Sequence, residues 1–89
     1  MAEEKILFKT EEPKSLTEVA DFLRALADKL TEGKVVLRKG SEEIALTIPA
    51  NVVLEMKAEQ KIKGHKTKYS LEVEIEWREG DQEGPLTLG

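Results

Sequence analysis

The chain has 89 residues, enough for one small domain in which nearly all the apolar side chains are needed for a single core. It contains no cysteine, which excludes disulfides, thiolate catalysis and thiolate metal sites, and no apolar run suited to a signal peptide or membrane span, so we expect a cytoplasmic protein. With 18 acidic and 14 basic residues the net charge is -4, which disfavours nucleic acid as a partner because phosphate groups are repelled.

The first two predicted elements are a short strand and a helix. Ile6, Leu7 and Phe8 alternate between two faces within residues 5–10, which predicts a strand that ends before Pro13. Ser15 follows at the start of an apolar pattern with helical spacing.

The helix is delimited by recognisable caps. Ser15 and Glu18 have the spacing of a capping box, and Gly33 stands where a left-handed C-terminal cap belongs. Between them an apolar stripe recurs at three- and four-residue steps. Its members are Leu16, Val19, Ala20, Leu23, Leu26, Ala27 and Leu30. Phe22 lies beside this stripe, so we expect it at the rim of the core.

Residues 34–39 and 42–48 flank Gly40-Ser41, which is suited to a two-residue hairpin turn. This turn pairs Leu37 with Ile44 and Val35 with Leu46. It also places Arg38 opposite Glu43 on the outer face, a pairing that the opposite charges support.

The connection 49–51 has three residues, an odd number that keeps the apolar positions of the flanking strands on one face. Asn51 tolerates the left-handed conformation that a bulged three-residue hairpin requires, so we expect an antiparallel meander to continue here.

The last two strands form a long hairpin that turns at Gly64-His65. From Tyr69 to Trp77 apolar and polar residues alternate without a break, which predicts one buried and one solvated face. The turn places Lys57 opposite Glu72 and, at a mild cost, Glu55 opposite Glu74, although a slip of two residues is also compatible with the sequence.

These elements predict an α+β fold in the order β-α-β-β-β-β. One helix packs on a mainly antiparallel sheet of four to five strands, and residues 1–78 form a single domain. The face under the helix comprises Val35, Leu37, Ile44, Leu46, Ile48, Leu54, Met56, Leu71, Val73 and Ile75. Residues 79–89 contain three glycines and a proline and are expected to be a flexible tail.

The combination of a helix with the run FLRALA (22–27), Pro49 before a strand, and the closing run LEVEIEW (71–77) resembles the amphi-Trp domain family. The resemblance covers residues 6–77. It implies a small prokaryotic domain of unassigned activity, and it carries no catalytic residue onto this chain.

No residue pattern specifies a reaction, a cofactor or a metal. The only histidine, His65, lies at the hairpin tip without an orienting carboxylate or a nucleophile beside it in the sequence. Glu72, Glu74 and Glu76 form a carboxylate row, but a spacing of about 7 Å along a strand is too wide for two monodentate ligands on one ion. We therefore interpret the row as a solvated face and expect the chain not to be an enzyme.

The hairpin 57–68 is the most basic segment, with five lysines and one glutamate. The lysines are Lys57, Lys61, Lys63, Lys66 and Lys68. They could contact an acidic protein surface, a phosphate-rich ligand or RNA, or they could merely solubilise the hairpin and protect its edges.

Two further surfaces are candidates. Trp77 could be a platform for a ligand or partner, or it could pack in the core. Val36 and Val53, with Ala45 and Thr47, could form a small apolar patch on the outer face that seats a partner or a second copy in a weak homo-oligomer. The leading hypothesis is thus a protein-interaction module with an unknown protein partner, and the alternative is anion binding through the 57–68 hairpin.

Overall fold

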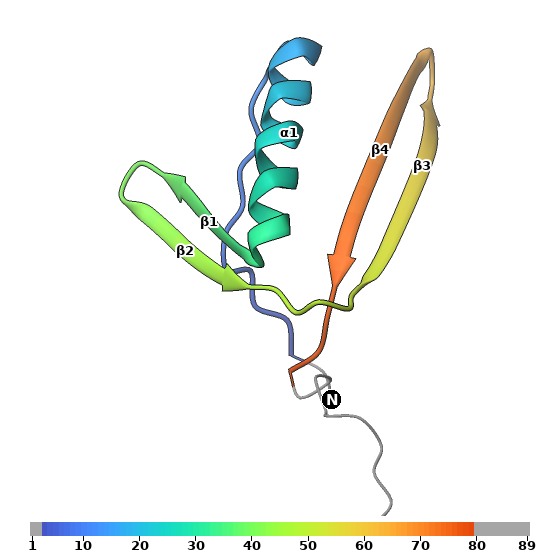
Figure 1. The fold of residues 1–89 in the computed structure, drawn as a ribbon. Coiled ribbons are helices and arrows are strands. Elements are labelled where there is room, and N and C mark those ends of the chain that lie inside the picture. Colours follow the sequence, from blue (N-terminus) through green and yellow to red (C-terminus); the bar gives the residue numbers. More distant parts are fainter. Residues whose placement is uncertain (1–2, 80–89) are drawn as a thin grey trace, which may run out of the picture. The chain divides into compact units, whose positions relative to one another are not determined.

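The computed structural model describes residues 3–79, which contain one helix and two β-hairpins (Figure 1). The elements are α1 (Leu16–Glu32), β1 (Lys34–Lys39), β2 (Glu42–Thr47), β3 (Val53–Lys63) and β4 (Lys66–Glu76). They belong to two compact units that divide between Ile48 and Pro49. The first unit holds α1 and the β1–β2 hairpin, and the second holds the β3–β4 hairpin.

The predicted caps of α1 are confirmed. The backbone N–H of Glu18 donates to the Ser15 hydroxyl (3.1 Å), and the N–H of Ser15 donates back to the Glu18 carboxylate (3.3 Å), which completes the capping box. At the other end Gly33 has a φ of 77°, and its N–H donates to the Leu30 carbonyl. Such a left-handed φ costs least at glycine, so the sequence defines both ends of α1.

The β1–β2 hairpin has the predicted register. Val35 lies opposite Leu46, Leu37 opposite Ile44, and Arg38 opposite Glu43, whose carboxylate lies 3.3 Å from the guanidinium. α1 contacts β1, and Val35, which is only 5% exposed, is the one buried apolar residue among the described residues. The core of the first unit is therefore centred on Val35.

The β3–β4 hairpin also has the predicted register, with Lys57 opposite Glu72 and Glu55 opposite Glu74. Each strand has eleven residues, and Gly64, with a φ of 61°, begins the two-residue turn. The alternation gives this ribbon one charged face and one apolar face.

The predicted first strand is wrong, because residues 5–10 form no strand. The segment is extended and lies beside the β1–β2 turn, where residues 6–9 and 41–43 line an open hollow. Ile6 and Leu7 are exposed and Phe8 is half-buried. Alternation alone predicted a strand, but a strand also needs a hydrogen-bonded neighbour, and the sequence did not identify one.

The predicted continuous sheet is also wrong, because the described strands form two separate two-stranded antiparallel sheets, β1–β2 and β3–β4. The β2–β3 connection spans residues 48–52 rather than three residues, and no residue other than glycine has a positive φ within 3–79. Asn51 therefore lacks the left-handed conformation that the expected bulged hairpin requires.

The burial of the predicted core follows this division. The first-unit members of the expected buried face are buried or half-buried, whereas Leu54, Met56, Leu71 and Val73 of the second unit are 56–71% exposed. The predicted tail lies, apart from Glu79, outside the described residues. Within 3–79, no helix is long and apolar enough to cross a membrane.

Candidate functional site

The predicted site residues fall mainly on the charged face of the β3–β4 hairpin. In its middle Glu59 accepts both neighbouring lysines: its carboxylate oxygens lie 3.0 Å from the Lys57 ammonium and 3.3 Å from that of Lys61. Hydrogen bonds from Lys57 and Lys61, together with their charges, lower the pKa of Glu59, and the hydrogen bond to Glu59 raises the pKa of Lys57. Two of the five lysines are thus already paired within β3.

The tip of the hairpin is a cluster of four lysines. Lys61 lies opposite Lys68, and Lys63 lies opposite Lys66, so two adjacent cross-strand pairs bring like charges together on one face. His65 lies in the turn beside them and is exposed. The structure therefore assembles the basic hairpin that the sequence predicted.

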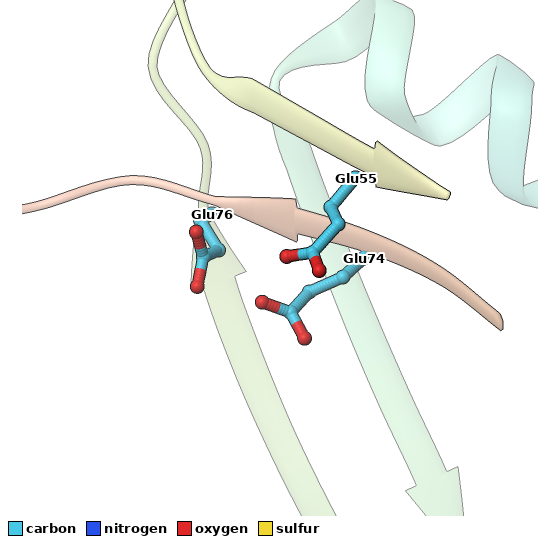
Figure 2. A group of neighbouring side chains, drawn as sticks. All are labelled: Glu55, Glu74 and Glu76. Atoms are coloured by element: carbon cyan, nitrogen blue, oxygen red, sulfur yellow. The ribbon is translucent and has the colours of Figure 1, made fainter. Parts of the chain in front are cut away.

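The opposite end of the same face is acidic (Figure 2). One carboxylate oxygen from each of Glu55, Glu74 and Glu76 lies within 4.8 Å of the others. The hydrogen bond with Glu76 and the negative charge of that side chain raise the pKa of Glu74. Carboxylate oxygens suit Mg²⁺ or Ca²⁺, but all three side chains are exposed and supply only part of a coordination sphere.

This cluster corrects the interpretation based on strand spacing. A separation of about 7 Å between alternate positions of one strand predicted carboxylates too far apart to share an ion. The flexible side chains converge, and Glu55 joins from the neighbouring strand. The cross-strand pairing of Glu55 with Glu74 was already a signal in the sequence, because it places a third carboxylate beside the row.

The apolar face of the hairpin, which we call the ribbon face, carries the large exposed side chains. Its apolar members are Leu54, Met56, Ala58, Ile62, Tyr69, Leu71, Val73 and the half-buried Ile75, and Gln60 and Thr67 share the face. Leu71 is 71% exposed and Tyr69 is 72% exposed, and the Tyr69 hydroxyl accepts a hydrogen bond from the Gln60 amide (3.0 Å). Sequence reasoning assigned this face to the core, so it was not recognised as a candidate surface.

Trp77 lies just beyond β4 and is half-buried. It lines an open hollow with Val52, Val53, Ile75 and Arg78, among others, all within the second unit.

The predicted outer patch is assembled only in part. Val36 lies opposite Ala45, and Thr47 shares their face, but Val53 belongs to the separate β3–β4 sheet. Val36 is 37% exposed and Val53 is 61% exposed.

Together, the fold and these surfaces define a small α+β domain that presents a long two-faced β-ribbon. The Amphi-Trp domain model matches residues 1–88, and the chain therefore belongs to the Amphi-Trp domain family. This confirms the resemblance carried by the closing 71–77 run. No curated protein and no solved structure matches the chain.

Proposed function

We propose that this chain is a non-enzymatic protein-interaction module whose binding surface is the ribbon face of β3–β4. The observation that supports this proposal is the exposure of large apolar side chains along a regular surface, with Leu54, Met56 and Leu71 each more than 60% exposed. Contiguous apolar surface on a soluble protein is typical of interaction sites.

The energetics of a two-stranded sheet support the same role. An isolated two-stranded hairpin is marginally stable in water, because it buries little apolar surface for the backbone entropy it loses. A partner that covers the ribbon face buries its apolar surface. This burial stabilises both the complex and the folded hairpin.

The polar side chains also favour binding over catalysis. Within residues 3–79 no polar or charged side chain is buried, whereas catalytic groups usually gather in a cleft that excludes water. The hollows at one end and in the middle of the β3–β4 ribbon and beside the β1–β2 turn are open to solvent, and open surfaces suit contact with another macromolecule.

The experiment is an affinity pull-down from cell lysate with the purified chain at low and high salt. Met56→Lys places a charge on the ribbon face and raises the net charge by one, and its control Glu55→Lys, on the adjacent residue of the charged face, raises the net charge by two. We expect a protein partner that is retained at high salt, lost with Met56→Lys and kept with Glu55→Lys. Equal retention by the two variants would contradict a ribbon-face interaction.

The alternative function, anion binding, is favoured by one specific observation, the two cross-strand lysine pairs at the hairpin tip. Point charges of this kind attract phosphate groups or acidic peptides, and salt screens the attraction over a distance of about 10 Å at 0.1 M. The tip carries no arginine or stacking aromatic side chain, so it offers little for reading bases.

The test of this alternative replaces four tip lysines with glutamine and measures binding to heparin or polyphosphate at two salt concentrations. The tip variant changes Lys61, Lys63, Lys66 and Lys68. The matched control changes Lys5, Lys9, Lys34 and Lys39, which alters the net charge equally in the first unit. If the tip binds anions specifically, only the tip variant loses binding to heparin or polyphosphate. Equal loss of binding in both variants would mean that the net charge alone causes the attraction, which would contradict a site at the tip.

A further inference from the structure

β4 has an unusual order of charges along its length. On the charged face its first half carries Lys66 and Lys68, and its second half carries Glu72, Glu74 and Glu76, with Ser70 between them. Among the described strands β4 pairs only with β3, so its other edge presents unpaired backbone N–H and C=O groups. The strand therefore has a free edge, and its charged face has a positive and a negative half.

Within the hairpin three of these five charges face like charges, whereas Glu72 faces Lys57 and Glu76 faces Val53. Lys66 lies opposite Lys63, Lys68 opposite Lys61, and Glu74 opposite Glu55. Like charges directly opposite one another on an antiparallel pair are destabilising.

The described part of the chain compensates for these contacts only at Lys61, whose ammonium pairs with the Glu59 carboxylate. Among residues 3–79, no ion pair engages Lys66, Lys68 or Glu74. The pKa of Glu74 is raised chiefly by Glu76 of the same strand, and the facing carboxylate of Glu55 adds a smaller contribution.

We propose that the β4 strands of two copies of this chain pair antiparallel about a two-fold axis at Leu71. In this register each residue faces the residue equally far on the other side of Leu71, and all eleven residues of β4 are used. On the charged face the pairs with the second copy are Lys66 with Glu76, Lys68 with Glu74, and Ser70 with Glu72. By symmetry every pair occurs twice, so four lysine–glutamate pairs form.

The apolar face is matched in the same register. Leu71 lies opposite Leu71 of the second copy, and Tyr69 lies opposite Val73, an aromatic and β-branched pair of the kind that stabilises antiparallel sheets. The product is a four-stranded sheet in the order β3-β4-β4-β3, with a ribbon face twice as wide. Self-association through the edge does not depend on which partner occupies that face.

Other registers fit the residues less well. A slip of one residue places apolar side chains opposite charged ones on both faces. Centring the axis on Glu72 places this carboxylate against itself, and parallel pairing in register places every charge beside its own kind. Centring on Ser70 keeps lysine–glutamate pairs but leaves the last two residues of β4 without partners in the opposite strand.

The free edge of β3 is a less favourable site for pairing with a second copy. On β3 the carboxylate of Glu59 already pairs with Lys57 and Lys61, so these charges are matched within their own strand. A two-fold contact also closes on itself, whereas pairing β4 of one copy with β3 of the next would leave a free edge at each end and build open fibres.

The test is the mass of the full chain in solution, measured by light scattering or sedimentation. The wild type is expected at twice the 10.0 kDa of one chain. Two charge-reversal variants, Lys66→Glu/Lys68→Glu and Glu74→Lys/Glu76→Lys, are each expected at the mass of one chain, because reversal makes their own β4 edges repel.

These variants provide their own controls. Within the hairpin the reversals at Lys66, Lys68 and Glu74 replace like-charge pairs by opposite ones, and Glu76 faces the uncharged Val53. Loss of the dimer therefore does not follow from a weakened hairpin. When the two variants are mixed, every reversed residue faces an opposite charge, and the mass of two chains is expected to return.

Cross-linking tests the register directly. The chain has no cysteine, and paired Cα atoms of an antiparallel ladder lie about 4.5–5.5 Å apart. That distance suits a disulfide, which spans about 4.4–6.8 Å. Leu71→Cys is therefore expected to form a covalent dimer on oxidation, whereas Tyr69→Cys and Val73→Cys are expected to cross-link when mixed and not alone.

Three results would overturn the proposal. The first is a wild type with the mass of one chain at every concentration that permits the measurement. The second is a dimer that survives both charge reversals, which would place the contact on another surface. The third is a mixture of reversed variants that stays at the mass of one chain.

Discussion

The two hairpins of this protein follow the same sequence rules and differ in what covers them. β1–β2 has six-residue strands, contacts α1 and encloses Val35, whereas β3–β4 has eleven-residue strands and leaves most of its apolar face exposed. Both have the register that turn residues and alternation predict. Local patterns thus determine the pairing of a hairpin, and a covering element determines whether its apolar face becomes core.

The largest expected effect concerns burial, and it compares the same substitution in each hairpin. Val35→Ala removes buried methyl groups beneath α1 and is expected to lower the free energy of unfolding by about 2 kcal/mol. Val73→Ala, at a position 56% exposed, is expected to lower it by about 0.5 kcal/mol. Urea denaturation of both variants at low protein concentration measures the difference. Equal losses would mean that the ribbon face is as well covered as Val35.

This contrast also explains what the sequence could predict. The capping box, the Gly33 cap, both two-residue turns and the facing of Arg38 with Glu43 depend on residues close together in the chain, and all were predicted correctly. The strand at 5–10 and the pairing of β2 with β3 depend on a distant neighbour or on a backbone angle at Asn51. The alternation of apolar and polar residues specifies neither the neighbouring strand nor this backbone angle.

Some features of the candidate site could likewise be predicted from the sequence, and others could not. Register alone predicted the facing of Glu55 with Glu74 and the basic tip around Gly64-His65. The convergence of Glu74 with Glu76 depends on side-chain rotamers, which strand spacing does not specify. The exposure of Leu71 could not be read from the sequence, because an apolar alternating strand has the same pattern whether it faces a core or a partner.

A smaller effect is expected at the start of α1. Ser15→Ala removes the hydroxyl that accepts the N–H of Glu18, which is expected to cost about 1 kcal/mol. Ser70→Ala on the charged face of β4 is the matched control, because the Ser70 side chain makes no hydrogen bond among the described residues. Thermal unfolding of the two variants should shift only for Ser15→Ala. An equal shift for both would contradict the importance of the capping box.

The smallest expected effects are those of pH on the stability of the fold, and they have opposite signs in the two units. Glu18, whose pKa is lowered by hydrogen bonds with Ser15, stabilises the fold above its unfolded pKa, and this contribution is lost as the pH falls through its folded pKa. Glu74, whose pKa is raised by Glu76, contributes stability below its unfolded pKa, and this is lost as the pH rises through its folded pKa.

Carboxylate titration by NMR measures both directions. The Glu18 midpoint is expected below the ordinary glutamate value and the Glu74 midpoint above it. Ser15→Ala should return the first midpoint towards the ordinary value, and Glu76→Gln should return the second. Titration midpoints that do not change on these substitutions would contradict Ser15 and Glu76 as the causes of the two pKa shifts.

The most direct test of the difference between the hairpins is backbone hydrogen exchange of the wild-type chain over a range of protein concentrations. We expect amides of β1–β2 to be protected equally at every concentration, because their core lies within the first unit. We expect amides of β4 to exchange rapidly in dilute protein and to gain protection as the concentration rises and its edge pairs with a second copy. Protection of β3–β4 that is already high in dilute protein and does not change would contradict the proposal that this hairpin is an open surface to which a partner binds.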